Sequence, residues 1–308
     1  MIAIVIPYYK LVFFEETLQS LARQTDKRFK VYVGDDASPD DCIHLIKNYS
    51  DKIEILYKRF NDNIGSHSLT THWERCIDLI DNKAIEWIMI LGDDDVLDEN
   101  VVHNFYNTIP TINEINIIRF ASQVINEKKE NLSSVYTHPI LENPYNAFIR
   151  KLDSITRSSL SEYIFRKSVF HKFKFTNYPL AWYSDDKAWL DFSESKNIYS
   201  INTAIVKIRL SNFNISGNTN ALFKEQKVIA SIAFYYDVID MYFKHFTKHQ
   251  KIQLLYAYEE HVREYRKIKH AEWFFILKKS LELSDVSLIL KFLKRSLLHI
   301  IGYPVSRS

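Results

Sequence analysis

Short apolar runs alternate with helical stretches in the first third of the chain, and this alternation limits the possible folds most strongly. The runs cover residues 2–6, 29–33, 53–57 and 87–91, and the predicted helices cover residues 14–23, 41–48, 68–80 and 99–109. Strands connected by helices form a parallel sheet that is buried on both faces. The sequence therefore predicts an α/β, Rossmann-like fold with a mixed, mainly parallel sheet flanked by helices.

The second part of the chain has a different pattern. Strands are predicted at residues 117–121, 163–165 and 204–210, and a short helix is predicted near "YSDDKAWLDFS". From residue 221 the chain has almost no Pro or Gly before Gly302 and shows helical periodicity. We expect one domain over residues 1–217, with halves at 1–110 and 111–217, and a C-terminal α-helical extension of three or four helices over 218–308.

Composition excludes several classes of protein. The 308 residues contain 40 basic and 38 acidic side chains, a net charge of +2 that is too balanced for a general nucleic-acid binder. Cys42 and Cys76 predict neither a disulfide framework nor a zinc site, so a reducing, cytoplasmic compartment is expected. The first apolar run lacks a preceding basic region and indicates a strand, and no run reaches the roughly 20 residues of a membrane span.

Polar clusters follow three of the predicted strands: "PYY", "GDDAS" and "GDDD". In parallel sheets ligands bind outside the carboxyl ends of the strands, so these clusters mark one candidate site. Asp35 and Asp36 are suited to accept hydrogen bonds from a ribose or a base, although a turn before a helix capped by Asp40 explains the same stretch. In the loop "NDNIG", Asn63 and Gly65 precede a helix, where backbone N–H groups can face an anion; loop chemistry alone explains them equally well.

Three consecutive carboxylates, Asp93, Asp94 and Asp95, repel one another unless water or a cation accompanies them. One interpretation is a solvated loop before a helix that Asp98 caps. The other is a divalent metal site, because Mg²⁺ and Mn²⁺ bind one or two carboxylates together with substrate phosphates. The position at the same sheet edge as "GDDAS" favours the metal.

The order and spacing of "VIPYYK", "VGDDASPDD", "NDNIG" and "LGDDDVL" resemble the nucleotide-binding half of GT-A fold glycosyltransferases of family 2. This resemblance implies a nucleoside-diphosphate sugar donor, with UDP favoured, a divalent metal (Mn²⁺ or Mg²⁺) and inversion at the anomeric carbon. It also implies that residues 1–110 bind the donor and residues 111–217 the acceptor. The donor-binding residues that it implies are Pro7, Tyr8, Asp35, Asp36, Asn63, Gly65 and Asp93, with Asp94 and Asp95 as metal ligands.

The chain departs from the family at one position. Gly92 stands where the common Leu-Asp-x-Asp-Asp form has its first Asp, so the resemblance leaves open which carboxylate of the triplet binds the metal. Asp94 is favoured because it aligns with the closing Asp of the motif. Near "DDKAWLDFS" the family carries an acidic pair, which implies Asp186 as the general base, although capping of a helix explains Asp185 and Asp186 as well.

Two features near the C-terminus allow two interpretations each. Arg209 resembles a family residue that approaches the diphosphate, and a surface strand arginine is the alternative. The last predicted helix combines large apolar residues with Lys291, Lys294 and Arg295, which suits either an interfacial membrane helix or packing on the protein. Peripheral contact with the inner face of the cytoplasmic membrane is therefore possible.

The function that these features predict is transfer of one sugar to a glycan or lipid-linked saccharide, in O-antigen, capsule or related cell-surface polysaccharide biosynthesis. One alternative is a nucleotidyltransferase or metal-dependent phosphohydrolase on a similar sheet, although "PYYKLVFF" lacks a phosphate-binding glycine loop. Another is a non-catalytic protein that binds sugar nucleotides. The sequence does not reveal the sugar, the acceptor, the linkage or the oligomeric state.

Overall fold

The computed structural model describes residues 1–112, 114–212, 215, 217 and 220–300, with side chains to residue 298. The chain forms two compact units, Met1–Thr219 (unit 1) and Asn220–Ser308 (unit 2). Each unit has its own arrangement of elements and is described by itself.

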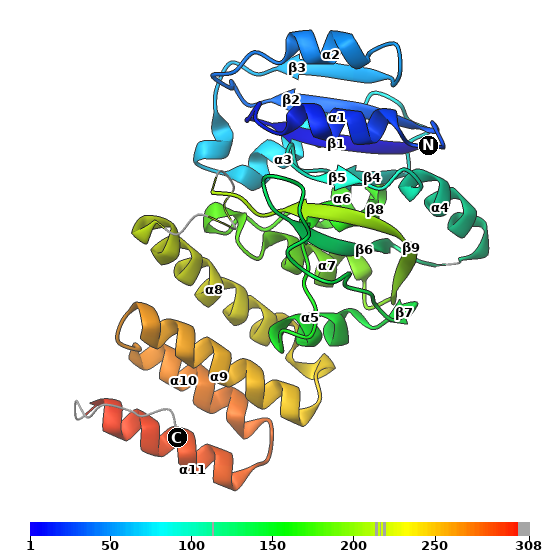
Figure 1. Ribbon diagram of the computed structural model, residues 1–308. Coiled ribbons are helices and arrows are strands. Elements are labelled where there is room, and N and C mark those ends of the chain that lie inside the picture. The colour runs from blue at the N-terminus through cyan, green and yellow to red at the C-terminus, as the bar shows by residue number, and fades with distance from the viewer. Residues whose placement is uncertain (113, 213–214, 216, 218–219, 301–308) are drawn as a thin grey trace. The chain divides into compact units, whose positions relative to one another are not determined.

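Unit 1 is built on one mixed sheet with the strand order β3-β2-β1-β4-β8-β6-β9-β5, and β7 pairs with β9 (Figure 1). The first four strands in this order are parallel, and β8 joins β4 to β6 by antiparallel pairing. The predicted GT-A-like, mainly parallel sheet is therefore confirmed. The strands are β1 (Ile2–Tyr8), β2 (Phe29–Asp35), β3 (Ile55–Arg59), β4 (Trp87–Ile90), β5 (Val96–Leu97), β6 (Ile117–Ile125), β7 (Leu141–Glu142), β8 (Tyr163–Arg166) and β9 (Ile198–Arg209).

Helices cover both faces of this sheet. Because side chains alternate along a strand, Ile4 and Ile6 enter one apolar core and Ala3 and Val5 enter the other. This burial on both faces explains why the strands appear in the sequence as continuous apolar runs. The helices of unit 1 are α1 (Phe14–Ala22), α2 (Ile43–Tyr49), α3 (Leu69–Ile77), α4 (Val101–Thr108), α5 (Pro144–Leu152), α6 (Lys167–Phe173) and α7 (Ser184–Ser193).

Two predicted helix caps are wrong. Helix α2 begins after Cys42 and α4 after Asn100, and neither cap position makes a side-chain capping bond. Asp40 instead contributes its carbonyl to Tyr8, and the Asp98 carboxylate pairs with Lys207 at 3.2 Å. Both aspartates thus bind neighbouring strands. Helices α2 and α4 begin at Ile43 and Val101, each two residues later than predicted.

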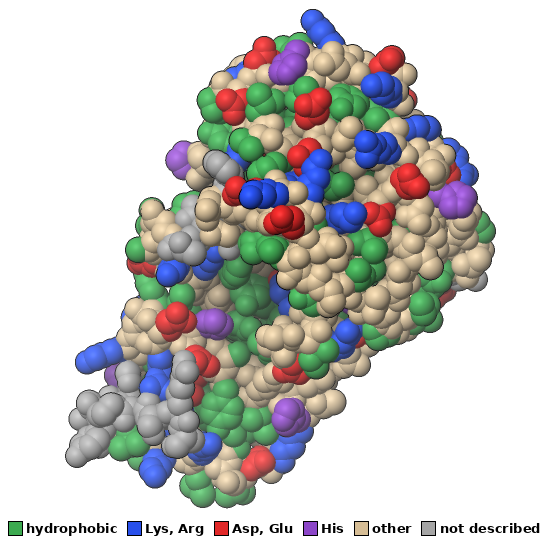
Figure 2. Space-filling view, in the orientation of Figure 1, with side chains coloured by type: hydrophobic (Ala, Val, Ile, Leu, Met, Phe, Trp, Pro, Cys, Tyr) green, Lys and Arg blue, Asp and Glu red, His purple; other side chains and the backbone are tan. Residues whose placement is uncertain are grey.

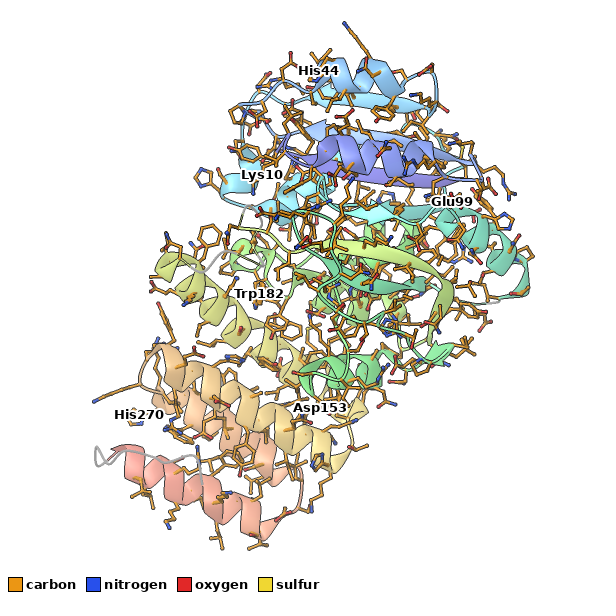
Figure 3. The ribbon with its side chains drawn as sticks, viewed as in Figure 1. Lys10, His44, Glu99, Asp153, Trp182 and His270 are labelled. Atoms are coloured by element: carbon orange, nitrogen blue, oxygen red, sulfur yellow. The ribbon has the colours of Figure 1, made fainter. Side chains whose placement is uncertain are left out.

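The register of the sheet brings the polar clusters to one edge. Tyr8 is paired with Asp35, and Asp35 with Arg59, so β1, β2 and β3 end side by side. Figure 3 shows Lys10, which follows β1, at this end of the sheet and Glu99 at the opposite end. The site that the sequence predicts at the carboxyl ends of the strands therefore has its residues at one edge.

Unit 2 is helical, as predicted. Its helices are α8 (Ala221–Tyr242), α9 (Lys248–Tyr265), α10 (His270–Leu281) and α11 (Val286–Ile300). Asn220 caps α8, and Thr247 and Gln250 form a capping box on α9. Within the described part of the chain, no helix combines the length and the apolar character that crossing a membrane requires.

Candidate active site

The aspartate triplet lies just beyond β4, and its two outer carboxylates make defined hydrogen bonds. Asp93 Oδ2 accepts the backbone N–H groups of Tyr9 and Lys10, each at 2.8 Å, which ties the triplet to the end of β1. Asp95 Oδ1 accepts the Arg209 N–H at 2.8 Å, and Asp95 Oδ2 accepts the Ser161 hydroxyl at 2.5 Å. These bonds hold Asp94, the middle residue, between two anchored neighbours.

The three carboxylates of the triplet are crowded together, and their charges repel one another. Burial, followed by the charge of Asp94, raises the pKa of Asp93 to about 6 and that of Asp95 to about 7. A Cβ atom on Gly92 would lie 2.9 Å from Asp95 Oδ2 and 3.1 Å from Asp94 Oδ1, so two carboxylate oxygens converge over this glycine. An aspartate at position 92 would have to displace them, which accounts for the departure from the family pattern.

The donor set suits a cation that also has ligands outside the protein. No group of three or more His, Cys, Asp or Glu residues that could hold a metal occurs in the described residues. Mg²⁺ and Mn²⁺ commonly bind through one or two carboxylates and complete their coordination with substrate phosphates and water. The converging oxygens of Asp94 and Asp95 fit that kind of site.

Asp36 and the loop after β3 form a second part of the same edge. The Asp36 carboxylate accepts the backbone N–H groups of Ile64 at 3.0 Å and Gly65 at 2.9 Å, and it pairs with Arg75. A Cβ on Gly65 would lie 2.4 Å from Asp36 Oδ2, so only glycine permits this approach. The anion that the N–H of Gly65 faces is thus the protein's own carboxylate. Asn63 shapes the loop by accepting the Ser66 N–H at 3.0 Å.

Two further predicted nucleotide contacts, Asp35 and Tyr8, are buried. Asp35 has no exposed surface and accepts hydrogen bonds from Tyr57 at 2.6 Å and Arg59 at 2.8 Å. The Tyr8 side chain lies in the core, where its hydroxyl donates to the Asp40 carbonyl at 3.2 Å. Pro7 is paired with Gly34 inside the sheet. A nucleotide contact by Pro7, Tyr8 or Asp35 stays a prediction.

Arg209 lies behind the triplet. Its side chain has no exposed surface, so the alternative of a surface strand arginine is wrong. Nε donates to the Asp94 carbonyl at 2.9 Å, Nη1 donates to the Asn126 carbonyl at 2.9 Å, and Nη2 pairs with Glu16 at 2.5 Å. With its backbone bond to Asp95, Arg209 fixes the position of the triplet. Direct contact with a diphosphate stays a prediction, because it requires the guanidinium to exchange these partners.

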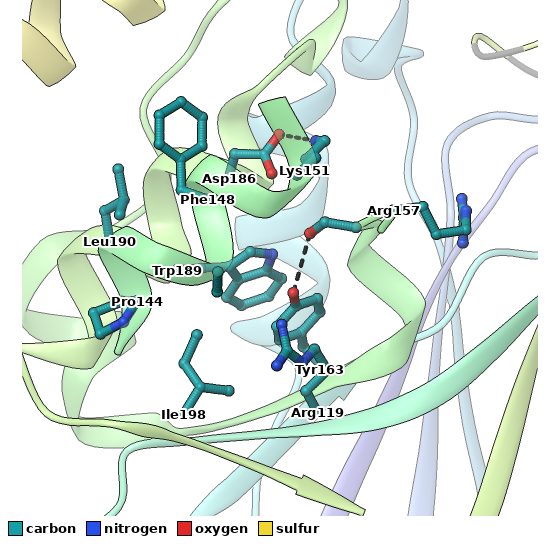
Figure 4. Close-up of a pocket in the computed structure, with 12 residues that line it drawn as sticks. Arg119, Pro144, Phe148, Lys151, Arg157, Tyr163, Asp186, Trp189, Leu190 and Ile198 are labelled. Atoms are coloured by element: carbon teal, nitrogen blue, oxygen red, sulfur yellow. Dashed lines mark hydrogen bonds and ion pairs between the residues drawn. The ribbon is translucent and has the colours of Figure 1, made fainter. Parts of the chain in front are cut away.

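The predicted acidic pair stands in the first turn of α7. Asp186 is buried and its Oδ2 pairs with Lys151 of α5 (Figure 4). Burial opposes the charge of Lys151, but Asp186 and Asp185 outweigh burial and raise the pKa of the lysine. Burial, followed by the charge of Asp186, raises the pKa of Asp185 to about 7.

Asp186, but not Asp185, lines a small cavity in unit 1. The cavity wall combines cationic and aromatic side chains, among them Arg119, Lys151, Phe148, Tyr163 and Trp189. The rings of Tyr163 and Trp189 stack with centroids 4.1 Å apart. The acidic pair therefore presents one carboxylate, that of Asp186, to this cavity beside a stacked aromatic wall.

The backbone before the acidic pair is strained. Leu180, Ala181 and Tyr183 have φ values of 57°, 52° and 67°, in the left-handed region that non-glycine residues rarely adopt. Each such residue costs on the order of 1–3 kcal/mol, and such strain clusters at functional sites. The Tyr183 ring lies 5.2 Å from Lys151 Nζ, so the strained turn also brings an aromatic face to the ion pair.

Residues 157–162, which sequence reasoning missed, connect the triplet with the acidic pair. The Ser161 hydroxyl accepts the Gly92 N–H at 2.9 Å and donates to Asp95. Arg157 and Ser158 line the cavity that contains Asp186. The stretch "RSSLSE" resembles an ordinary polar loop, so no pattern in the sequence marks it.

Comparison with known proteins identifies the family. The model of the family described as "Glycosyl transferase family 2" matches residues 3–173, which is more than half of the chain. No curated protein matches the sequence.

Solved structures have the same fold. The crystal structure of residues 1–349 of S. aureus TarS in complex with UDP-GlcNAc superposes with a TM-score of 0.62, at 13% identity, and covers 92% of this chain and 80% of that one. The complex of the same fragment with UDP gives a TM-score of 0.58 at 13% identity, covering 93% and 82%. Full TarS gives 0.61 at 13% identity, and the match covers 93% of this chain but 50% of TarS. The solved structures show that the fold is shared, and the family match shows that the chain belongs to glycosyl transferase family 2 and is a glycosyltransferase.

Proposed function

We propose that this glycosyltransferase moves a sugar from a UDP-linked donor to a hydroxyl of a saccharide or lipid-linked saccharide, with inversion at the anomeric carbon. The observation that supports this most is the connection of two acidic clusters by residues 157–162, because such a transfer needs a charged donor site beside a base. The similar TarS structures contain UDP-GlcNAc or UDP, which favours UDP as the nucleotide.

In this proposal the donor lies along the edge formed by β1, β2 and β4. Asp36, with the Asn63 and Gly65 loop, contacts the base or ribose, and Asp93 lies near the ribose. The backbone of Pro7 and Tyr8 borders the base. Asp35 supports this region from within the sheet, since its oxygens already bind Tyr57 and Arg59.

A divalent cation, Mn²⁺ or Mg²⁺, is part of the proposal. Asp94 and Asp95 would hold it, because their oxygens converge over Gly92. When bound, such an ion neutralises charge on the departing diphosphate. Arg209 contributes by fixing both aspartates from behind.

Asp186 is the proposed general base. The acceptor oxygen forms a bond to the anomeric carbon while the bond from that carbon to the diphosphate oxygen breaks, and Asp186 takes the hydroxyl proton. Its position on the cavity wall favours it over Asp185. Lys151 holds Asp186 in position through their ion pair, and the strained turn before α7 presents the pair.

The biological setting is also a proposal. Transfer to a saccharide or lipid-linked acceptor suits O-antigen, capsule or related cell-surface polysaccharide assembly in the cytoplasm, at the inner face of the membrane. Family membership disfavours nucleotidyl transfer and phosphohydrolysis. A non-catalytic role in binding sugar nucleotides is the alternative that an experiment separates.

The test is the Asp186→Asn variant, compared with Asp191→Asn as a matched control. Both aspartates are buried on α7 and pair with a lysine, but only Asp186 lines the cavity. We expect Asp186→Asn to lower sugar transfer and donor hydrolysis by about 10²–10⁴-fold while UDP still binds. Undiminished turnover in Asp186→Asn would show that this residue is not the base.

A further inference from the structure

Unit 2 exposes a row of large apolar side chains on α11. Val286, Leu290, Leu293 and Leu297 are 70%, 60%, 40% and 63% exposed. Their spacing of four, three and four residues places all of them on one face of the helix. We call these four residues the α11 stripe. Two exposed apolar side chains of α10, Phe274 and Leu281, increase the apolar surface near the C-terminus.

The opposite face of α11 already packs inside unit 2. Leu288 and Phe292 are buried, the Phe292 ring lies 5.1 Å from that of Tyr256, and Arg295 pairs with Glu259 of α9 at 2.8 Å. The internal core therefore holds α11 in place without using the α11 stripe. Exposed contiguous apolar surface of this kind marks a site of interaction with another phase or partner.

Basic residues border the α11 stripe on one side. Lys291 and Lys294 are exposed on α11 and lie on the same side of the α11 stripe. Lys278 is exposed on α10. Residues 220–308 contain 15 basic and nine acidic side chains, a net charge of +6, whereas residues 1–219 contain 25 basic and 29 acidic side chains, a net charge of −4. Figure 2 shows hydrophobic and basic side chains side by side on the surface of unit 2. The positive charge of the chain is thus concentrated in the unit that exposes the stripe.

We infer that α11 is an interfacial helix whose α11 stripe enters the headgroup region of an anionic lipid bilayer while Lys291 and Lys294 contact lipid phosphates. An apolar face bordered by lysines is the arrangement that lies in a membrane surface, and each lysine near an anionic surface adds about fivefold in affinity. An acidic protein partner or a second copy of the chain is disfavoured, because lysines on only one side of a leucine row suit a planar negative surface. This inference does not depend on the proposed reaction.

The test uses the full chain and vesicles, with sedimentation as the measurement. Wild-type protein is mixed with vesicles of phosphatidylcholine alone and with vesicles containing equal parts of phosphatidylglycerol and phosphatidylcholine. Variant Leu290→Ser with Leu297→Ser removes the centre of the stripe. The matched control is Leu132→Ser with Leu222→Ser, which changes two leucines of similar exposure, one in each unit. None of these four side chains is buried, so all variants should keep their thermal unfolding midpoint.

We expect wild-type protein and the control to sediment with the anionic vesicles and not with phosphatidylcholine alone. The stripe variant should bind at least about tenfold more weakly, since each lost leucine contact is worth about tenfold. Lys291→Glu with Lys294→Glu should also bind at least about tenfold more weakly.

The inference is overturned if wild-type protein ignores anionic vesicles, or if the stripe variant binds them as tightly as the control. Light scattering identifies the rival explanation. A wild-type oligomer that Leu290→Ser with Leu297→Ser converts to a monomer, without vesicle binding by either protein, would assign the stripe to self-association instead.

Discussion

Replacing Lys151 with Met should move the pH dependence of catalysis. Lys151 pairs with Asp186 Oδ2, and the two side chains are only 25% and 5% exposed. Opposite charges about 4 Å apart interact by about 4 kcal/mol at an effective dielectric constant of about 20, which corresponds to about three pKa units. Water that reaches the exposed part of the lysine reduces this value, so we expect the acid limb of the kcat/KM profile to move by about two pH units in the variant.

The direction of the shift follows from the neighbouring carboxylate. Burial and Asp186 already raise the pKa of Asp185 to about 7. Lys151 lowers the pKa of Asp185, so without the lysine that pKa rises further and the acidic pair holds a proton at neutral pH. The acid limb of the kcat/KM profile should therefore move upward by about two units, with a loss of at least about tenfold at pH 7 that recovers in alkaline buffer. Lys151→Arg keeps the positive charge, so the acid limb of its kcat/KM profile should lie at the wild-type pH.

A matched control separates this effect from loss of stability. Lys187 pairs with Asp191 at 2.6 Å on α7, and neither residue lines the cavity. Lys187→Met and Lys151→Met should each destabilise the protein by about 3–5 kcal/mol, because each removes the lysine of an ion pair with a buried carboxylate. Only Lys151→Met should shift the limb. An unmoved limb in folded Lys151→Met, or an equal shift in Lys187→Met, would refute the reasoning.

Three further predictions concern the donor edge. Gly65→Ala should lower the free energy of unfolding by about 1–3 kcal/mol in urea titration, because its Cβ displaces the Asp36 carboxylate from two N–H donors; an unchanged midpoint would contradict this. Because the pKa of Asp95 is raised, the native state holds a proton that the unfolded chain has released, so the free energy of unfolding falls as pH rises from about 4 to 7. Asp95→Asn should remove this contribution to the slope of the free energy of unfolding against pH. An identical slope in the variant would contradict the prediction. Arg209→Met should cost about 3–5 kcal/mol, measured by thermal unfolding, because it removes the ion pair with Glu16 and the hydrogen bonds to three backbone carbonyls. A loss below about 1 kcal/mol would show that these bonds matter little.

The sheet could be predicted from the sequence because strands buried on both faces leave continuous apolar runs. The edge strand β3 begins at Ile55, two residues later than predicted, since Ile53 is buried outside the strand and continues the apolar run. Helix α5 escaped prediction although Asn143 caps it and Pro144 occupies its first turn. Asn143 and Pro144 are also typical turn residues, and a helix of nine residues shows only a short periodic pattern.

The candidate site could be predicted only where its residues are close in sequence. The triplet and the acidic pair are local clusters, and their position follows from the strand before them or the helix that they begin. Lys151, Ser161 and Arg209 were beyond prediction, or predicted in another role, because each acts on an aspartate 35 to 115 residues away. Such pairings depend on how α5, β8 and β9 pack, which no local pattern encodes.

Calorimetric titration of UDP into the full chain, with and without Mn²⁺, tests the central claim most directly. We predict that UDP binds in the presence of Mn²⁺, and that binding weakens at least about tenfold without the metal or in Asp94→Asn. The absence of binding by UDP and by every other nucleoside diphosphate in the presence of Mn²⁺ would contradict the proposed donor site.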